Sequence, residues 1–292
     1  MAQQQSRDGS FGSESQYGRH VGITALACLA FVSDGNVPGR GRFADVVERG
    51  LVFTLNSTAE QSGLIAAETS YGPMYGHGFA TLFLAEMYGM SVRPDLREKL
   101  RKAVALIVRT QNNQGGWRYH PVAQDADLSV TVCQIMALRA ARNVGVRVPK
   151  RTIDRAIKYV HESQNTDGGF RYMMDSTGSM FARSAAGIAA LYYAGLYEDD
   201  AIRRGLGYVE KFLPGRTQEQ THYFYGHYYA VQAMYLAGGP HWKRWWPAIR
   251  DELIAKQAPE GFWRGQAGTE YGTAMALIIL QVPARTLPIF QQ

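Results

Sequence analysis

Two carboxylic acids close together in the middle of the chain are the side chains best suited to acid chemistry. In the stretch Gln124-Asp-Ala-Asp-Leu-Ser-Val-Thr131, Asp125 and Asp127 stand two positions apart. A carboxyl that burial and hydrogen bonds keep protonated is a proton donor. Of the two acids, Asp127 stands directly before an apolar helical run, so we expect it at the beginning of a buried helix.

Asp127 is one of six polar residues that stand at the beginnings of apolar helical runs. The six are His20, His77, Asp127, Arg183, His227 and Glu270. Helix capping explains an aspartate and a glutamate at this end of a helix. It does not explain three histidines and an arginine, because cations are unfavourable there. If the helices surround one cavity, we expect all six side chains to point into it.

Tyrosines occur at the same level as these polar residues. The chain has 17 tyrosines, more than a core requires, and five of them fall near the starts of the apolar runs: Tyr17, Tyr75, Tyr225, Tyr228 and Tyr271. Tyrosine suits a cavity wall because its ring is apolar and its hydroxyl is polar. We expect these rings to line the predicted cavity.

An internal repeat defines the elements that would position these residues. A pattern of Gln, three residues, Gly, any residue and an aromatic occurs at 5–11, 111–117, 164–170 and 257–263, and a degenerate copy ends at Ile65. Positions 11, 65, 117 and 170 are 54, 52 and 53 residues apart, and the longer step to 263 fits two shorter units. Such periods indicate stacked supersecondary units.

Two kinds of helix flank each motif. Amphipathic helices, with apolar residues at spacings of three and four, are expected near 42–55, 93–110, 150–163, 199–212 and 241–256. Helices that are apolar or small on nearly all sides, which is typical of burial, are expected to begin near 21, 77, 128, 183, 228 and 271. We therefore predict an all-α fold, an α/α toroid with six inner and about five outer helices, in preference to an open solenoid.

A sixth outer helix would have to precede Gln5. Because the sequence has no room for it, we expect residues 1–292 to form a single toroid domain whose N-terminal outer helix is missing, as in a trimmed or processed chain. Without that outer helix, we expect apolar surface on the inner helix at 24–31 to be exposed, or to be covered by residues 284–292 or by another molecule.

The repeat resembles that of squalene and oxidosqualene cyclases and of the β-subunits of protein prenyltransferases, over residues 5–292. This resemblance implies the α/α toroid of the terpenoid cyclase and protein prenyltransferase superfamily. It also implies a structural role for the Gln and aromatic residues of the motif, which tie outer helices together in that family. It does not fix a reaction, because one fold serves several chemistries.

The segment around Asp127 resembles the D-x-D-D-T-A motif of class II terpene cyclases. Asp125 and Asp127 match the first two aspartates, and Leu128 stands in place of the third. The resemblance implies that Asp127 protonates an alkene or epoxide to start a carbocation cascade, with His77 or His227 as the histidine partner found in the family. Tyrosine faces would stabilise the cations.

This interpretation assigns two groups of site residues. The catalytic candidates are Asp127, Asp125, His77 and His227. The substrate-binding candidates are Tyr75, Tyr225, Tyr228, Arg183, Glu270, Tyr271 and His20. The substrate is expected to be an isoprenoid or a similar hydrophobic small molecule, and no cofactor is required.

Three other functions remain open at this stage. The segment Asp127-Leu-Ser129 resembles the D-x-C element of the prenyltransferase zinc site, so Asp127, His77 and His227 are an alternative set of ligands for zinc or another divalent metal. A polysaccharide lyase or hydrolase of the α/α-barrel type would use Tyr and His as acid and base, with Arg183 holding a uronate. A non-catalytic toroid would only bind a hydrophobic ligand.

The composition narrows the partners. The net charge of +6 (31 basic and 25 acidic residues) is spread along the chain, which argues against nucleic-acid binding. Cys28 and Cys133 lie in apolar runs and are expected to be buried thiols. No run is long enough to span a membrane and no signal sequence is evident. We expect a soluble protein, cytoplasmic or released from a longer precursor; peripheral membrane contact and oligomeric state stay open.

Overall fold

The computed structural model describes residues 1–13, 15–67, 72–215, 221–284, 287 and 289, which form eleven α-helices and isolated β-bridges without a strand. Six helices form the inner layer: α1 (Val21–Ser33), α3 (Met74–Tyr88), α5 (Leu128–Asn143), α7 (Phe181–Tyr193), α9 (Tyr223–Ala237) and α11 (Thr269–Gln281). Five form the outer layer: α2 (Ala44–Asn56), α4 (Leu96–Arg109), α6 (Lys150–Glu162), α8 (Asp200–Val209) and α10 (Gly239–Lys256).

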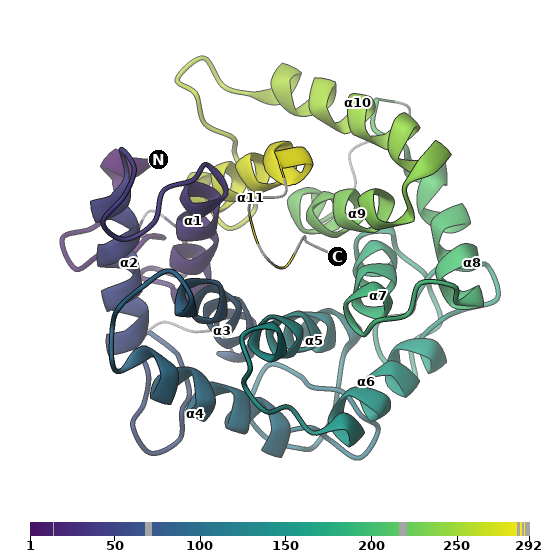
Figure 1. The fold of residues 1–292 in the computed structure, drawn as a ribbon. Helices are drawn as coiled ribbons and strands as arrows, with labels where there is room; N and C mark the ends of the chain where they lie inside the picture. The colour runs from purple at the N-terminus through teal and green to yellow at the C-terminus, as the bar shows by residue number, and fades with distance from the viewer. Residues whose placement is uncertain (14, 68–71, 216–220, 285–286, 288, 290–292) are drawn as a thin grey trace.

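The inner helices close into a ring. Each packs against the next inner helix along the chain, and α11 packs against α1 (Figure 1). The outer helices lie around this ring, so the predicted all-α toroid is confirmed and an open solenoid is excluded. The inner helices begin within three residues of the predicted positions, except α9, which begins at Tyr223 and not near 228.

The two layers differ in burial as their sequences predict. All thirteen residues of α1 are buried, whereas α6 buries only Thr152, Ala156, Tyr159 and Val160 and turns its charged residues outward. An inner helix has neighbours on nearly every side, so its sequence must be apolar or small all round.

Three copies of the repeat motif join the loop that carries them to the outer helix that follows: α2, α6 and α8. In one copy, Gln111 Nε2 donates to the carbonyl oxygens of Gly115 (2.8 Å) and Thr152 (2.9 Å), and Trp117 Nε1 donates to the Ile107 oxygen (2.7 Å). Gly115 has a φ of +102°, and a Cβ on it would lie 2.2 Å from the Arg155 oxygen. Gln5 and Gln164 make equivalent pairs of bonds. These contacts agree with the structural role that the resemblance implied.

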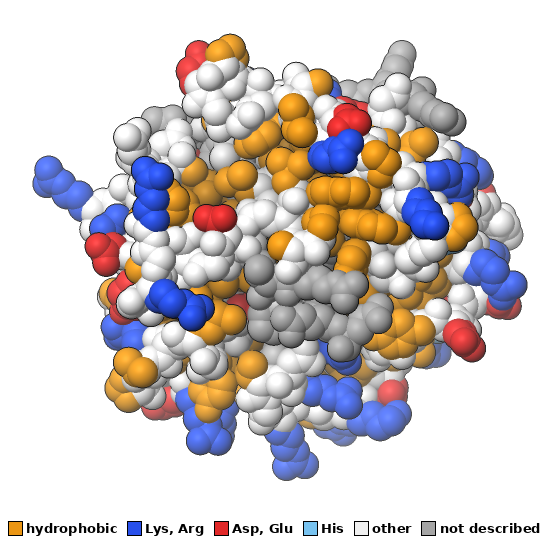
Figure 2. All heavy atoms as spheres, turned by 45° about the horizontal axis from the view of Figure 1, so that its top comes forward, with side chains coloured by type: hydrophobic (Ala, Val, Ile, Leu, Met, Phe, Trp, Pro, Cys, Tyr) orange, Lys and Arg blue, Asp and Glu red, His pale blue; other side chains and the backbone are white. Residues whose placement is uncertain are grey.

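The 24–31 helix is buried along its whole length and α2 packs on it, so the expectation of exposed apolar surface there is wrong. The alternative that residues 284–292 cover it falls mostly outside the described residues. The outer helices α2, α4, α8 and α10 pack chiefly on the inner helix that precedes each of them, whereas α6 packs on both of its inner neighbours. On α11, Leu277 and Leu280 are partly exposed. Figure 2, which brings the top of Figure 1 forward, shows hydrophobic side chains gathered on the face turned to the viewer.

Two residues of the C-terminal segment lie at the other end of the ring. Leu287 and Ile289 are buried, and the Ile289 amide donates to Glu86 Oε1 (3.1 Å) near the end of α3. The rest of 285–292 lies outside the described residues. Cys28 and Cys133 are buried free thiols, as predicted. None of the described helices combines the length and hydropathy of a transmembrane span.

Candidate functional site

A cavity of about 990 Å³ opens at the end of the toroid where the inner helices begin. Its wall comes from the first turns of inner helices and from the loops that precede them. The aromatic and polar residues of the wall are Tyr17, His20, Tyr75, Phe79, Tyr119, His120, Ser129, Tyr172, Arg183, His222, Tyr225, Gln266 and Tyr271. The apolar remainder includes Ile23, Leu26 and Met180. The wall is thus mainly aromatic and aliphatic, with a few polar groups.

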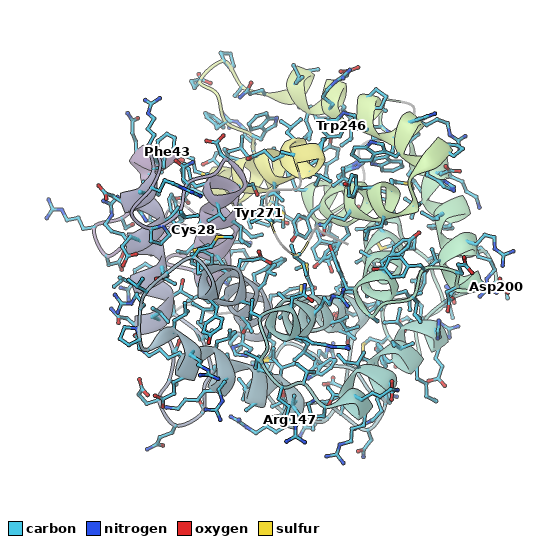
Figure 3. The ribbon with its side chains drawn as sticks, in the orientation of Figure 1. Cys28, Phe43, Arg147, Asp200, Trp246 and Tyr271 are labelled. Carbon is cyan, nitrogen blue, oxygen red and sulfur yellow. The ribbon has the colours of Figure 1, made fainter. Side chains whose placement is uncertain are left out.

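Tyrosine rings dominate this wall. Tyr75 and Tyr225 meet edge to face with ring centres 6.5 Å apart, and the Tyr225 hydroxyl donates to the Ser129 oxygen (3.0 Å). Burial raises the pKa values of Tyr75 and Tyr225 well above 10, so both hydroxyls stay neutral. Tyr271 lies on the inner side of α11, whereas Trp246 lies on the outer layer (Figure 3). Such a wall suits hydrocarbon and attracts cations.

Arg183 is the one Lys or Arg among the described residues that line the cavity. Its Nε donates to the Phe170 oxygen (3.0 Å) and its Nη2 to the Gly178 oxygen (2.7 Å), and the guanidinium lies 5.9 Å from the centre of the Tyr172 ring. These contacts fix the guanidinium and leave further N–H groups to bind an anionic or carbonyl group.

Asp127 lies just behind the cavity wall and caps α5. Its Oδ1 accepts from the Val130 amide (2.9 Å), and the side chain is 0% exposed. Its Oδ2 is buried without a hydrogen-bond partner, 4.0 Å from Arg118 Nε. Burial raises the pKa of this carboxyl to about 6, against the lowering effect of the Val130 bond and Arg118. The Asp127 carboxyl is therefore easier to protonate than an exposed aspartate.

Asp125, the second acid of the pair, stands apart from the cavity. Its side chain is half exposed and forms an ion pair with Arg118. Asp125 does not line the cavity, so this arrangement does not place it in contact with a bound substrate, as the predicted catalytic role requires.

His77 and His227 point away from the cavity. His77 accepts from the Ile65 amide (3.1 Å) and bonds to the Ala103 oxygen (3.2 Å), which ties α3 to its surroundings on the outer side. His227 packs among Phe181, Tyr223 and Trp245. Burial lowers the pKa values of His77 to about 4 and of His227 to about 3, so both are neutral.

Helix geometry explains this outward placement. In both Tyr-Gly-His segments the tyrosine, Tyr75 or Tyr225, lines the cavity. The histidine two residues later is turned by about 200° around the helix and faces the opposite side. The prediction that all six polar side chains converge is therefore wrong for His77 and His227.

The remaining predicted residues divide in the same way. His20 lines the cavity and caps α1, with Nδ1 accepting from the amides of Gly22 (3.1 Å) and Ile23 (3.3 Å). Burial lowers its pKa to about 4, so a neutral ring acts as the cap and the argument from cation repulsion does not apply. Glu270 is buried in the first turn of α11, and Tyr228 is buried with its hydroxyl 3.5 Å from Met136 Sδ; neither lines the cavity.

The alternative metal ligands do not meet. Asp127 caps α5, while His77 and His227 face the outer layer at two other places in the ring. Within the described part of the chain, no three His, Cys, Asp or Glu side chains are grouped as metal ligands. The donor set proposed for zinc therefore does not fit this arrangement.

Sequence reasoning missed Tyr119 and Tyr172, whose hydroxyls share a hydrogen bond at the cavity wall. A signal was present: each follows the motif aromatic by two residues, in Gly-Gly-Trp-Arg-Tyr119 and Gly-Gly-Phe-Arg-Tyr172. It also missed His222, which has a φ of 61°, lines the cavity and bonds through Nδ1 to Gln266 Oε1 (2.9 Å). Nothing in the local sequence marks that loop.

Comparison with known proteins supports the expected resemblance. No protein-family model matches the sequence. A drimenyl diphosphate synthase from Streptomyces showdoensis is 39% identical over 77 residues, which are 26% of this chain and 14% of that protein. The match thus covers a small part of the relative's length.

Solved structures share the fold over nearly the whole chain. The type II terpene cyclase MstE from Scytonema superposes with a TM-score of 0.67 and 15% identity, covering 98% of this chain and 95% of that one. A GH76 α-mannanase from Bacteroides thetaiotaomicron gives 0.61 and 12%, covering 89% and 84%. At these identities the likeness establishes the α/α toroid, and the reaction must be argued from the site.

Proposed function

We propose that this protein is a type II terpene-cyclase-like enzyme that acts on an isoprenoid or similar hydrophobic substrate, with Asp127 as the proton donor. One observation carries the proposal: a fully buried carboxyl, with a pKa of about 6 and an unpaired Oδ2, lies directly behind a cavity walled by tyrosines. A buried acid with a raised pKa beside a hydrophobic cavity is suited to protonate an alkene.

The chemistry begins and ends with a proton. The O–H bond at Asp127 Oδ2 breaks, a C–H bond forms at one alkene carbon, and the other carbon becomes a cation that the next alkene attacks. The wall tyrosines stabilise the cations through their ring faces. The cascade ends when a C–H bond next to the last cation breaks, its electron pair forms the product alkene, and its proton returns through water to the Asp127 carboxylate. The alkene must approach to about 3–3.5 Å. We therefore expect the wall near Ser129 to rearrange when substrate enters.

Arg183 indicates how such a substrate would be oriented. MstE was solved with geranylgeranyl dihydroxybenzoate as its substrate, and the sequence relative is named for a terpenyl diphosphate. Both pair a hydrocarbon skeleton with a polar head. In this protein the aromatic wall fits a hydrocarbon chain, and Arg183 is the cation available for an anionic head.

Carbohydrate chemistry, which the mannanase-like neighbours would suggest, finds less support. Glycoside hydrolysis commonly needs two carboxyls that flank the scissile bond. No Asp or Glu is among the described residues that line the cavity. The metal-dependent alternative lacks its ligand set, as described above.

The test compares wild type with Asp127→Asn on geranylgeranyl diphosphate and geranylgeranyl dihydroxybenzoate. Asparagine keeps the size and the capping acceptor but removes the transferable proton. We expect cyclic products from wild type, at least a thousandfold slower turnover in the variant, and unchanged ligand binding measured by calorimetry. Asp154→Asn, which alters an exposed ion pair with Lys150, serves as the matched control and should retain full activity.

Two results would overturn the proposal. Equal turnover by Asp127→Asn would remove Asp127 as the acid. Tight binding of both substrates without turnover by wild type would make the protein a ligand-binding toroid.

A further inference from the structure

The Arg118 side chain lies between the two aspartates of the Asp125-Ala-Asp127 segment. Its Nη1 is bonded to Asp125 Oδ2 at the surface. Its Nε lies 4.0 Å from Asp127 Oδ2 in the interior. Both interior atoms are buried and neither has a hydrogen-bond partner. Two buried, complementary, unpaired atoms thus face each other at just beyond hydrogen-bond distance.

The other groups near the Asp127 carboxyl are neutral or acidic. They are Tyr75 on α3, Cys133 on α5, Tyr159 on α6, Tyr172 on the loop after α6, Tyr225 on α9, and Asp125. Burial raises the pKa values of the tyrosines and the cysteine, so they remain uncharged. Arg118 is therefore the cation in this set, and its position relative to Oδ2 controls how easily Asp127 ionises.

We propose that Asp125 is a positioning residue that holds Arg118 back from Asp127, and that Arg118 in turn stabilises the Asp127 carboxylate after it has given up its proton. This inference rests on the proposed role of Asp127 as acid. It replaces the predicted catalytic role of Asp125 with an indirect one, because Asp125 does not touch the cavity.

Each alternative placement of Arg118 would impair a buried acid. A direct ion pair of Arg118 with Asp127 would hold the carboxyl ionised and leave no proton to donate. Complete removal of Arg118 would leave the carboxylate formed by proton donation as an uncompensated buried charge. A guanidinium restrained at 4.0 Å allows the protonated state and still stabilises the charged one.

The neighbouring repeat supplies a matched control. Arg171 stands 53 residues after Arg118 and also follows a motif aromatic. The positions that correspond to Asp125 and Asp127 there are Gly178 and Met180, so this copy has the arginine without either acid. Arg171 Nε is buried and unpaired like that of Arg118. Substitution of Arg171 therefore removes a similar side chain without touching the proposed device.

The experiment follows the Asp127 carboxyl directly by ¹³C NMR titration of protein labelled at aspartate Cγ, with the signal assigned from its absence in Asp127→Asn. Asp125→Asn frees Arg118 to pair with Asp127, so the midpoint should fall by about one pH unit. Arg118→Gln should raise it by about one unit. The double variant should follow Arg118→Gln, because Asp125 acts through Arg118. Arg171→Gln should match wild type.

The pH dependence of kcat provides the functional readout. If Asp127 must be protonated, activity declines as pH rises through its pKa, and this decline should move to lower pH in Asp125→Asn and to higher pH in Arg118→Gln. A purely structural role for the pair would lower activity or stability without shifting the two variants in opposite directions.

The outcomes separate this inference from the proposed function. Unchanged NMR midpoints in both single variants, or shifts in the same direction, would overturn the positioning role whatever the protein catalyses. An Asp125→Asn shift that persists in full without Arg118 would do so too, because Asp125 would then act by its own charge. Opposite NMR shifts in a protein that turns over no isoprenoid would support the positioning role and count against the cyclase function.

Discussion

Asp127 illustrates how one residue joins a structural and a chemical property. Its Oδ1 caps α5, while burial of the whole carboxyl disfavours the charged form. The pKa of the Asp127 carboxyl rises from 3.8 to about 6 on folding. The carboxylate therefore binds a proton more tightly in the folded state than in the unfolded state. The stability that this provides is complete below about pH 3.8 and is lost as pH rises through 6.

Asp127→Asn should therefore stabilise the protein at neutral pH. Asparagine is an equally good cap and does not ionise. The free energy of unfolding of the variant should exceed that of wild type by up to roughly 3 kcal/mol at pH 7.5, and the difference should shrink toward zero near pH 3.5. Urea denaturation at several pH values measures this difference. A difference that does not vary with pH would mean that the carboxyl is not perturbed by burial.

Arg183 is the residue on which head-group recognition depends. Arg183→Gln should raise KM for a geranylgeranyl substrate with an anionic head by at least about tenfold, through loss of a charge-assisted bond. The kcat should change little, because the guanidinium binds the head group equally in the ground state and in the transition state. Geranylgeraniol, with its neutral head, should bind equally to both proteins. A KM increase for geranylgeraniol as well would indicate a general loss of cavity shape.

At the scale of the helices, the repeat motif works through close backbone contact. Gly115 and Gly145 both have positive φ values, but a Cβ on Gly115 would lie 2.2 Å from the Arg155 oxygen, whereas a Cβ on Gly145 would meet nothing within 4 Å. Substitution of Gly145 therefore measures the cost of the backbone conformation alone, and substitution of Gly115 adds the cost of a steric clash.

Gly145→Ala should destabilise the protein by about 1–2 kcal/mol, the cost of the left-handed conformation. Gly115→Ala carries the same cost and must also displace the backbone of α6 at Arg155, so it should destabilise by at least about 2 kcal/mol more. Thermal or urea unfolding of both variants measures the comparison. Equal losses of unfolding free energy in the two variants would show that Gly115 is needed only for its backbone conformation and not for the close contact.

At the scale of the whole molecule, the two ends of the toroid differ. One end holds the cavity, and at the other end Glu86 accepts from the Ile289 amide. Burial raises the pKa of Glu86 from 4.5 to about 8. Its protonated form is favoured on folding, so this stability is complete below pH 4.5 and is lost as pH rises through 8.

Glu86→Gln keeps an acceptor for the Ile289 amide and does not titrate. The variant should lose less stability than wild type between pH 5 and pH 9, and its C-terminal amides should exchange with deuterium no faster at pH 9 than at pH 6 after correction for intrinsic rates. In wild type, protection of the Ile289 amide should fall over that interval. Identical pH profiles for both proteins would exclude Glu86 as the titrating group.

The sequence by itself determined the architecture of this protein. Burial on all sides of Thr24–Phe31 and on one face of the 150–163 helix is a local periodic property, so the two layers, the repeat and the approximate helix starts follow from residue spacing. It also placed the tyrosines Tyr75, Tyr225 and Tyr271 at the cavity and Asp127 at the beginning of α5, because the first turns of inner helices form one end of a closed ring.

Only the tertiary structure decided which side chains share a space. Two residues separate Tyr75 from His77, yet about 200° of helix rotation sends one into the cavity and the other toward the outer layer. The register that selects the inward face depends on packing against neighbouring helices far away in sequence. The same is true of the Tyr119–Tyr172 bond, formed across 53 residues, and of the position of Arg118 between two aspartates. These contacts depend on how the loops fold over the ring, and no local periodicity encodes that arrangement.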